Sequence, residues 1–313
     1  MIDVDKLCKE LEDKYDLPLK AEHDQVSLYK KIQTALVICI FAAFVINAIV
    51  MIANQGNFNI FGVVSMMVGL VIAVVIVMVI FSFLTRNKVE AYSRKYADTV
   101  GRELLNQYFE NVYYHDGDQF GFRSIYKEAG YKEHYDISHS RRQMDLVYKG
   151  HNIKLMDILL EEETTDQDGN THTYTVFNGL FLEIEGSYGI GTKMSITKNR
   201  DIGVGKNKLE MDSKEFEDFF NVYTDDKVKS MQLLTAEVME RFKEMYGFSK
   251  NGFDVTFNNG KLYLRLYSSG HMFDYGTEEV IEKEYITKDL QTLYLITAIL
   301  DNIDYAIEAN HVL

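Results

Sequence analysis

The sequence predicts an α+β protein: an N-terminal two-helix transmembrane hairpin, a helical stalk, and a cytoplasmic domain with an antiparallel sheet and flanking helices. Three observations support this fold class. Residues 33–85 contain no Asp, Glu, Lys or Arg. The second half of the chain contains runs rich in β-branched and aromatic residues, joined by turn-forming residues. Apolar residues spaced three and four apart occur on both sides of these runs.

The uncharged tract contains two apolar stretches, residues 33–53 and 60–84, separated by a polar segment at residues 54–59. Because an α-helix rises 1.5 Å per residue, about 20 apolar residues cross the ~30 Å hydrocarbon core of a bilayer. Each stretch is long enough to do so. The sequence therefore predicts a transmembrane hairpin over residues 33–84, with the lipid bilayer as its first partner.

The charges beside the two stretches predict an orientation. Basic residues flank the tract on both sides, whereas residues 54–59 contain none. The nearest basic residues are Lys30, Lys31, Arg86 and Lys88. Because cytoplasmic flanks carry an excess of Lys and Arg, we expect a multi-pass protein of the inner (plasma) membrane with both termini in the cytoplasm.

Small residues recur every four positions on each predicted span, and such rows let helix backbones approach closely in lipid. These helix-packing positions are Ala35, Cys39, Ala43 and Asn47 on the first span and Ser65, Gly69 and Ala73 on the second. Two interpretations stay open: packing within the hairpin, or a homo-oligomer interface.

The segments beside the hairpin have helical patterns. Residues 1–32 form an N-terminal cytoplasmic segment, with an amphipathic helix at residues 3–16 that Pro18 is expected to end. Residues 85–115 form the stalk, in which apolar residues spaced three and four apart predict a helix that continues to about Tyr113.

Residues 116–313 are predicted to form the α+β domain, although residues 119–150 show no clear period. Turn-forming residues between alternating runs predict two hairpins. The first joins residues 154–165 to 171–186, and the second joins 253–257 to 261–267. Further strands are expected at residues 193–198 and 208–211, and helices after Asp212, over residues 235–246, and from Thr287.

Charge and cysteine content argue against several functional classes. Of the formal net charge of −14, −2 lies in residues 1–32 and −12 in residues 86–313, which is the wrong sign for a protein that binds the phosphate backbone of nucleic acids. The two cysteines, Cys8 and Cys39, support neither a disulfide framework nor a metal cluster. We expect no cofactor and no metal site.

Known catalytic motifs are incomplete in this chain. Residues 186–193 resemble a phosphate-binding loop, but Thr192 precedes Lys193 where that loop requires Lys followed by Ser or Thr. The acidic residues from 161 to 168 do not match the ligand spacing of a calcium loop. The densest group of acidic residues and histidine, and the candidate catalytic site, is His115, Asp116 and Asp118.

Three sequence blocks resemble one family. Phe177-Asn178-Gly179-Leu180-Phe181 resembles an F-x-G-L-F strand motif. Residues 208–226 resemble a block ending in F-x-V-Y-s-x-D, and residues 233–239 resemble L-L-T-p-x-F-M, with Ala236 where proline is common. With the two N-terminal spans, residues 90–270 resemble the domain of unknown function 3137 family of bacterial membrane proteins. That resemblance implies no activity, cofactor or catalytic residue.

The absence of a complete catalytic signature favours a non-enzymatic function. We expect a membrane-anchored cytoplasmic module that binds another protein or organises a membrane complex. Two alternatives stay open. One is an enzyme whose active site lies in the cytoplasmic domain, around His115, Asp116 and Asp118. The other is a transport or channel accessory subunit that oligomerises through its small-residue rows, although neither span carries a charge that could bind an ion.

Overall fold

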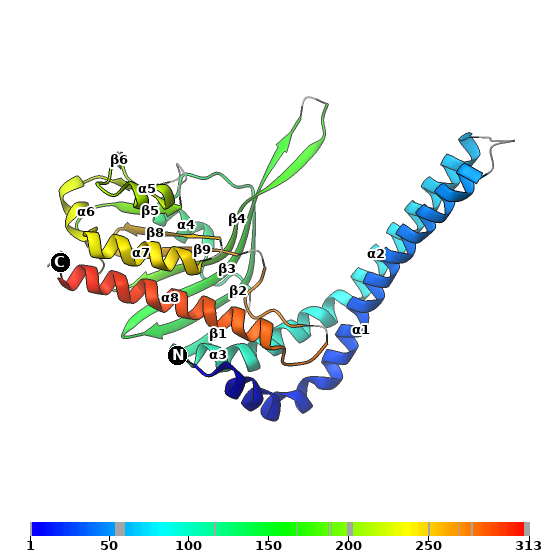
Figure 1. Ribbon diagram of the computed structural model, residues 1–313, viewed down its shortest axis with the longest axis horizontal. Coiled ribbons are helices and arrows are strands. Elements are labelled where there is room, and N and C mark those ends of the chain that lie inside the picture. Colours follow the sequence, from blue (N-terminus) through cyan, green and yellow to red (C-terminus); the bar gives the residue numbers. More distant parts are fainter. Residues whose placement is uncertain are drawn as a thin grey trace. The chain divides into compact units, whose positions relative to one another are not determined.

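The computed structural model describes residues 2–53, 60–115, 117–166, 168–186, 188, 190–198, 203–249, 251–268, 270–276 and 278–309. The chain divides into two compact units (Figure 1). Unit 1 comprises residues 1–101 and 275–286, and unit 2 comprises residues 102–274 and 287–313. The predicted α+β fold is confirmed, because long helices and an antiparallel sheet are both present.

Unit 1 is built on two long helices, α1 (Val4–Ala53) and α2 (Ile60–Tyr96). The prediction that Pro18 ends the first helix is wrong, since α1 continues through it. A proline inside a helix costs about 3 kcal/mol because it removes one hydrogen bond and crowds the preceding turn. Leu11 and Leu19, on either side of the proline, are both buried, and their burial favours an unbroken helix.

Side chains of α1 and α2 bond to one another at three levels. The Gln33 amide donates to Ser82 Oγ over 3.1 Å. Lys88 Nζ donates to the Tyr29 hydroxyl over 3.3 Å, and Lys95 contacts Glu22 at 2.5 Å. These contacts place the two helices side by side within unit 1.

In the described part of the chain, α1 contains one segment that is long and apolar enough to cross a membrane, within Val4–Ala43. Only 11% of this apolar stretch is buried, whereas the core helix of a soluble protein would be mostly buried. The second predicted span, residues 60–84, lies in α2, where some side chains fall outside the described residues. That both helices cross a membrane as a hairpin stays a prediction.

Residues 275–286 join unit 1 through an aromatic contact. The Tyr275 ring lies edge-on to the buried Tyr92 of α2, with 4.7 Å between centroids. Lys30 Nζ lies 4.0 Å from the centre of the Tyr275 ring, and the His23 imidazole is 3.3 Å from the Gly276 carbonyl oxygen. A segment distant in sequence is therefore held against the helices by stacking and a cation–π contact.

The prediction of a helix reaching Tyr113 is wrong. After α2 the chain forms a π-helical turn, Ala97–Gly101, and a short helix, α3 (Arg102–Leu105). It then enters strand β1 (Glu110–His115), which pairs with the next strand. This segment favours a strand because it contains a β-branched residue, Val112, and two tyrosines, Tyr113 and Tyr114. The four-residue spacing of apolar residues that continues to Val112 therefore does not indicate a helix here.

The nine described strands form one antiparallel sheet in unit 2, in the order β1-β2-β3-β4-β9-β8-β5-β7-β6. The predicted hairpins correspond to β3–β4 and β8–β9 and are confirmed. The strands after β1 are β2 (Ile137–Tyr148), β3 (His151–Thr165), β4 (Thr171–Glu185), β5 (Met194–Lys198), β6 (Asn207–Leu209), β7 (Phe220–Thr224), β8 (Phe253–Asn258) and β9 (Lys261–Tyr267).

Helices accompany the sheet and complete the core (Figure 1). The helix α4 packs on the sheet through Phe122 and Tyr126, which join a buried cluster with Phe181 and Tyr263. Figure 1 shows α7 and α8 running side by side over the sheet. The helices of this part are α4 (Phe122–Ala129), α5 (Lys214–Phe219), α6 (Lys227–Leu233), α7 (Ala236–Phe248) and α8 (Lys283–Ala309).

Two helix starts differ from prediction. Ser213, not Asp212, caps α5, because its hydroxyl oxygen accepts from the Phe216 amide at 3.3 Å. The last helix begins at Lys283, before the predicted Thr287. The two candidate caps of α5 are adjacent in the sequence, whereas α8 extends upstream of Thr287.

Candidate functional site

The predicted catalytic residues lie at the end of β1 and in the loop that follows. His115 Nε2 is 2.6 Å from a carboxyl oxygen of Asp145 on β2. Asp118 accepts hydrogen bonds from the Phe122 amide at 3.3 Å and from the Gln143 side chain at 2.6 Å. Asp116 lies outside the described residues. No hydrogen bond or ion pair joins His115 to Asp118 in the described residues, so each contacts its own β2 side chain. A catalytic role for the group stays a prediction.

Asp118 and Gln143 together hold the loop before α4. Gln143 is fully buried, and its side-chain oxygen Oε1 accepts from the backbone amides of Gln119 and Phe120 at 2.8 and 2.9 Å. A buried amide that satisfies two backbone donors stabilises a loop, because unpaired buried donors are costly. The geometry at Asp118 is that of a helix start anchored to the sheet.

The small-residue rows are described in part. Ala35 and Cys39 are exposed and Ala43 is half-buried, while the side chains of Asn47, Ser65 and Ala73 lie outside the described residues. A methyl group added at Gly69 would meet no atom within 4 Å. Both interpretations of the rows, hairpin packing and homo-oligomerisation, stay predictions.

The four flanking basic residues lie on α1 and α2. Lys30 stacks on Tyr275, and Lys88 donates to Tyr29. Arg86 pairs with Glu90 one turn along α2, at 2.6 Å, and Lys31 is exposed.

A two-stranded ribbon, residues 161–175, extends the β3–β4 hairpin beyond the rest of the sheet (Figure 1). Its neighbours stop earlier: β2 pairs with β3 only as far as Glu161, and β9 pairs with β4 only from Gly179 onward. In the described residues, the outer edge of residues 171–176 therefore pairs with no strand. An unpaired edge presents backbone amides and carbonyls that another chain can bond.

Among its described residues, the ribbon is exposed beyond Glu162. Residues 161–175 contain five acidic residues and neither Lys nor Arg. At the tip, Asp166 accepts from the Asn170 amide at 2.8 Å and lies 3.2 Å from His172 Nε2. The Asn170 amide is the main group that lowers the pKa of Asp166, so this carboxylate stays ionised. The ribbon therefore carries a negatively charged surface.

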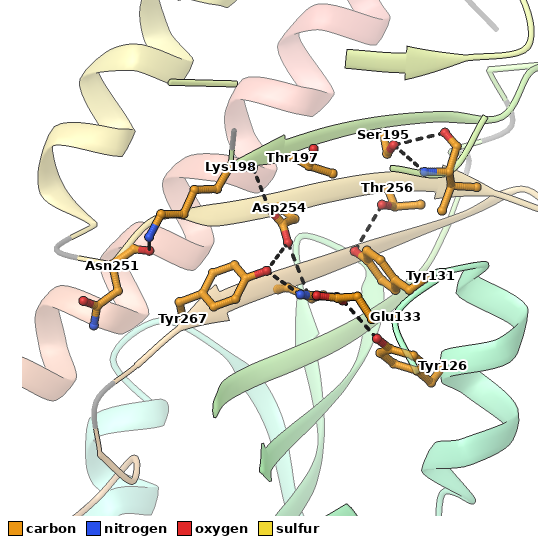
Figure 2. Close-up of polar contacts among 12 residues, drawn as sticks. Tyr126, Tyr131, Glu133, Ser195, Thr197, Lys198, Asn251, Asp254, Thr256 and Tyr267 are labelled. Carbon is orange, nitrogen blue, oxygen red and sulfur yellow. Dashed lines mark hydrogen bonds and ion pairs between the residues drawn. The ribbon is translucent and has the colours of Figure 1, made fainter. Parts of the chain in front are cut away.

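A buried polar network lies under α4, between β8, β9 and the segment that precedes β2 (Figure 2). At its centre, Arg265 Nε is 3.3 Å from Asp254 Oδ2, and neither side chain is exposed. The same guanidinium contacts Glu133 and the Tyr267 hydroxyl. Tyr267 donates to Asp254 over 2.6 Å. One buried cation thus bridges two carboxylates.

Tyrosines surround this cation. The guanidinium lies 4.4 Å from the centre of the Tyr131 ring, and Tyr126 donates to Glu133 over 3.1 Å. Burial raises the pKa of Tyr126, Tyr131 and Tyr267, so these hydroxyls stay protonated. Tyr126 and Tyr267 donate to carboxylates, whereas Tyr131 accepts from the Thr256 hydroxyl over 3.1 Å. Burial also raises the pKa of Asp254, against the opposing effect of Arg265. The central charges have no access to solvent, so the network holds strands together instead of contacting a ligand.

Sequence reasoning missed this network, although a signal for it exists. The β8–β9 turn pairs Asn258 with Lys261, and counting four residues outward from that pair places Asp254 opposite Arg265. An acid and a base directly opposite on two otherwise apolar strands predict an ion pair. What the pattern does not show is that Glu133, from a distant segment, completes it.

The strand motif that contains Gly179 has a packing explanation. A Cβ at this glycine would overlap the carbonyl oxygen of Leu266 on β9, and φ is +153°. The neighbouring Phe177 and Phe181 belong to the core cluster under α4. The motif therefore supports the close approach of β4 and β9.

Residues 175–305 match the family model described as "Protein of unknown function (DUF3137)". No curated protein and no solved structure shows a significant match to the chain. The matched range starts and ends later than the expected 90–270, and it includes all three sequence blocks that carried the resemblance. The resemblance predicted from the sequence is confirmed: over residues 175–305, this chain resembles the DUF3137 family of proteins of unknown function.

Proposed function

We propose that the protein is anchored in the inner membrane by α1 and α2, with both termini in the cytoplasm, and that unit 2 binds a partner protein through the ribbon. The exposed apolar side chains of both helices support the anchor. Phe41 on α1 is 70% exposed and Phe83 on α2 is 77% exposed. Burying such a side chain in an apolar environment is worth about 1.5–3 kcal/mol, and lipid supplies that environment.

The observation that carries the binding proposal is the unpaired outer edge of residues 171–176. This segment has the sequence Thr-His-Thr-Tyr-Thr-Val, which favours strands and contains neither proline nor a charged residue. Exposed edges in proteins are usually protected by Lys, Pro or a bulge. The register shift in this hairpin leaves Val176 without a partner on β3, at the base of the ribbon. Residues 171–175 beyond it form an edge of strand length that fits a partner segment adding one more strand.

The negative charge of the ribbon indicates the chemistry of the partner. The acidic residues of the ribbon flank the edge and no basic residue of the ribbon offsets them. A basic, extended segment of another protein complements this surface, and the opposite charges would accelerate association and fix its register. The proposed partner is therefore a protein with a Lys/Arg-rich segment at the cytoplasmic face of the membrane.

A photo-crosslinking amino acid in place of Tyr174 tests the proposal in the full-length protein in its membrane. Tyr174 is 57% exposed and lies within the free edge. We expect one discrete adduct, with the crosslinked peptide in a basic segment of the partner. The charge reversals Glu163→Lys and Asp168→Lys together should reduce the adduct at least fivefold.

A matched control makes the same charge change elsewhere on unit 2. Glu244→Lys on α7 with Glu308→Lys on α8 alters two exposed carboxylates outside the ribbon and should leave the adduct unchanged. An adduct that both charge-reversed pairs reduce equally would contradict docking on the ribbon. So would a crosslink to an acidic or helical segment.

A further inference from the structure

Unit 2 contains a pocket of about 300 Å³ at the end of β9, beside α8. Its lining comes from the end of α7 and the residues just before β8, from the end of β9 and the segment that follows it, and from one face of α8. Four of its lining side chains are apolar and almost fully buried: Leu180, Leu266, Met272 and Leu295. This volume is at the lower end of the range for small-molecule sites, and an apolar lining with a few polar groups is typical of them.

Asp289 of α8 is the buried charged residue in this lining, with 4% of its surface exposed. One carboxyl oxygen accepts from the Phe273 amide over 3.2 Å. Among the described residues, the other oxygen accepts no hydrogen bond and no basic group lies within ion-pair distance. An ionised carboxylate in such a place is costly unless a cation accompanies it.

Every other buried carboxylate among the described residues has a cation. Asp157 lies 3.3 Å from Arg141, Glu183 lies 2.7 Å from Lys154, and Asp254 lies 3.3 Å from Arg265. Asp289 differs from all three, and it is the one that lines a pocket. The fold therefore gives these three buried carboxylates a cation, whereas at Asp289 the pocket leaves room for a ligand to provide one.

The hydroxyl groups of the pocket also favour a donor ligand. Ser268 donates to the Gly270 carbonyl oxygen over 2.8 Å, and Thr292 donates to the Lys288 carbonyl oxygen over 3.0 Å. With their hydrogens committed, these oxygens can only accept from a ligand. A carboxyl group and two accepting hydroxyls together fit an ammonium group, which has only donors to offer.

We infer that the pocket binds a small organic cation, a primary ammonium on a short apolar body, with the ammonium paired to Asp289. The apolar body lies against the leucines and Met272. Two basic groups, Lys288 and His271, line the same pocket but are exposed, so solvent screens their repulsion.

Binding should depend on pH. Burial raises the pKa of Asp289 to about 7, with Lys288 and Arg142 acting against the rise and Asp274 adding to it. Only the ionised carboxylate pairs with an ammonium, so the competent fraction, and with it the affinity, should rise roughly tenfold from pH 6 to pH 8.

The test uses 2-phenylethylammonium as the probe and the full-length protein in lipid nanodiscs, with binding measured by saturation-transfer NMR and calorimetry. We expect Asp289→Asn, which keeps the acceptor for the Phe273 amide, to weaken binding at least tenfold. It should also abolish the rise in affinity between pH 6 and pH 8. Glu308→Gln, an exposed acid on the same helix, is the matched control and should leave the affinity unchanged.

Two further measurements keep the proposal open to refutation if Asp289→Asn folds poorly. Thr292→Leu narrows the pocket while keeping the carboxyl group, and it should also weaken binding of the amine. Lys288→Ala should leave amine binding equal or stronger. Preferential binding of 3-phenylpropanoate, lost in Lys288→Ala, would overturn the proposal in favour of an anion. Amine binding that is equal in wild type and Asp289→Asn would overturn it as well.

Discussion

Arg265 on β9 and Asp254 on β8 lie directly opposite each other in the antiparallel register, and both side chains are completely buried. Each therefore depends on the other for its counter-charge, with Glu133 as a second carboxylate on the same guanidinium. Breaking a buried ion pair leaves an uncompensated charge, whereas replacing both partners by apolar residues does not.

The first prediction concerns this pair. Arg265→Met should lower the free energy of unfolding by about 3–5 kcal/mol, because Asp254 and Glu133 then lose their shared cation. The double variant Arg265→Met with Asp254→Leu should recover part of the loss. Thermal and denaturant unfolding followed by circular dichroism measure both. Arg241→Met, which removes an exposed arginine of α7 paired with Glu237, is the control and should change stability by less than about 1 kcal/mol. Additive effects of the two substitutions would show that the pair is not coupled.

The second prediction concerns the strand motif. Gly179→Ala should destabilise unit 2 strongly, because the added methyl group overlaps the Leu266 carbonyl oxygen and forces β4 away from β9. Gly247→Ala makes the same chemical change in α7, where no atom lies within 4 Å of the new methyl group, and should be neutral or slightly stabilising. The melting temperatures of Gly179→Ala and Gly247→Ala measure the two effects. Equal values would contradict the close approach of β4 to β9 at Gly179.

The third prediction concerns the pH dependence of stability without ligand. The pKa of Asp289 is about 7 in the folded chain, against about 4 for an unfolded aspartate. Between these values the folded chain binds more protons than the unfolded chain, so stability falls as pH rises from 4 to 7. Relative to Asp289→Asn, the wild type should lose on the order of 4 kcal/mol across this window. Unfolding curves of both proteins, recorded at intervals of half a pH unit, measure this difference in the free energy of unfolding. Parallel pH profiles for the wild type and Asp289→Asn would contradict a buried carboxyl group without a counter-charge at this position.

The fourth prediction concerns orientation in the membrane. Asn57→Cys, in a chain with Cys8→Ser and Cys39→Ser, should react with a membrane-impermeant maleimide in intact cells, because the loop at residues 54–59 is proposed to face outward. Glu308→Cys in the same background should react only after the membrane is permeabilised. Labelling of both cysteines in intact cells, or of neither, would contradict the proposed topology.

Elements determined by local chemistry were predictable. The β8–β9 hairpin follows from Asn259-Gly260 between two alternating runs, because few other residues adopt the positive φ of both turn positions. The β3–β4 hairpin follows from an equally polar loop. The apolar segment of α1 follows from composition alone, because its length and hydropathy depend only on residues adjacent in the sequence.

Elements that depend on partners distant in sequence were not predictable. Val112 continues the helical spacing of the stalk, but pairing with β2 makes its segment a strand. Pro18 marks a helix end locally, yet burial on both sides keeps α1 continuous. Asp289 lies in the helix predicted from Thr287, but the sequence does not show that its side chain is buried and accepts from the Phe273 amide.

The sequence by itself determined the α+β class, the two central hairpins, the candidate membrane anchor and the family resemblance, because each depends on residues that are close along the chain. Only the tertiary structure decided that Arg265 shares two carboxylates, that the ribbon has an unpaired edge, and that Asp289 lines a pocket without a counter-charge. The physical reason is that the free-energy cost of a buried charge depends on the groups that surround it. Those surroundings come from segments far apart in the chain, as in the contact between Arg265 and Glu133, which are 132 residues apart.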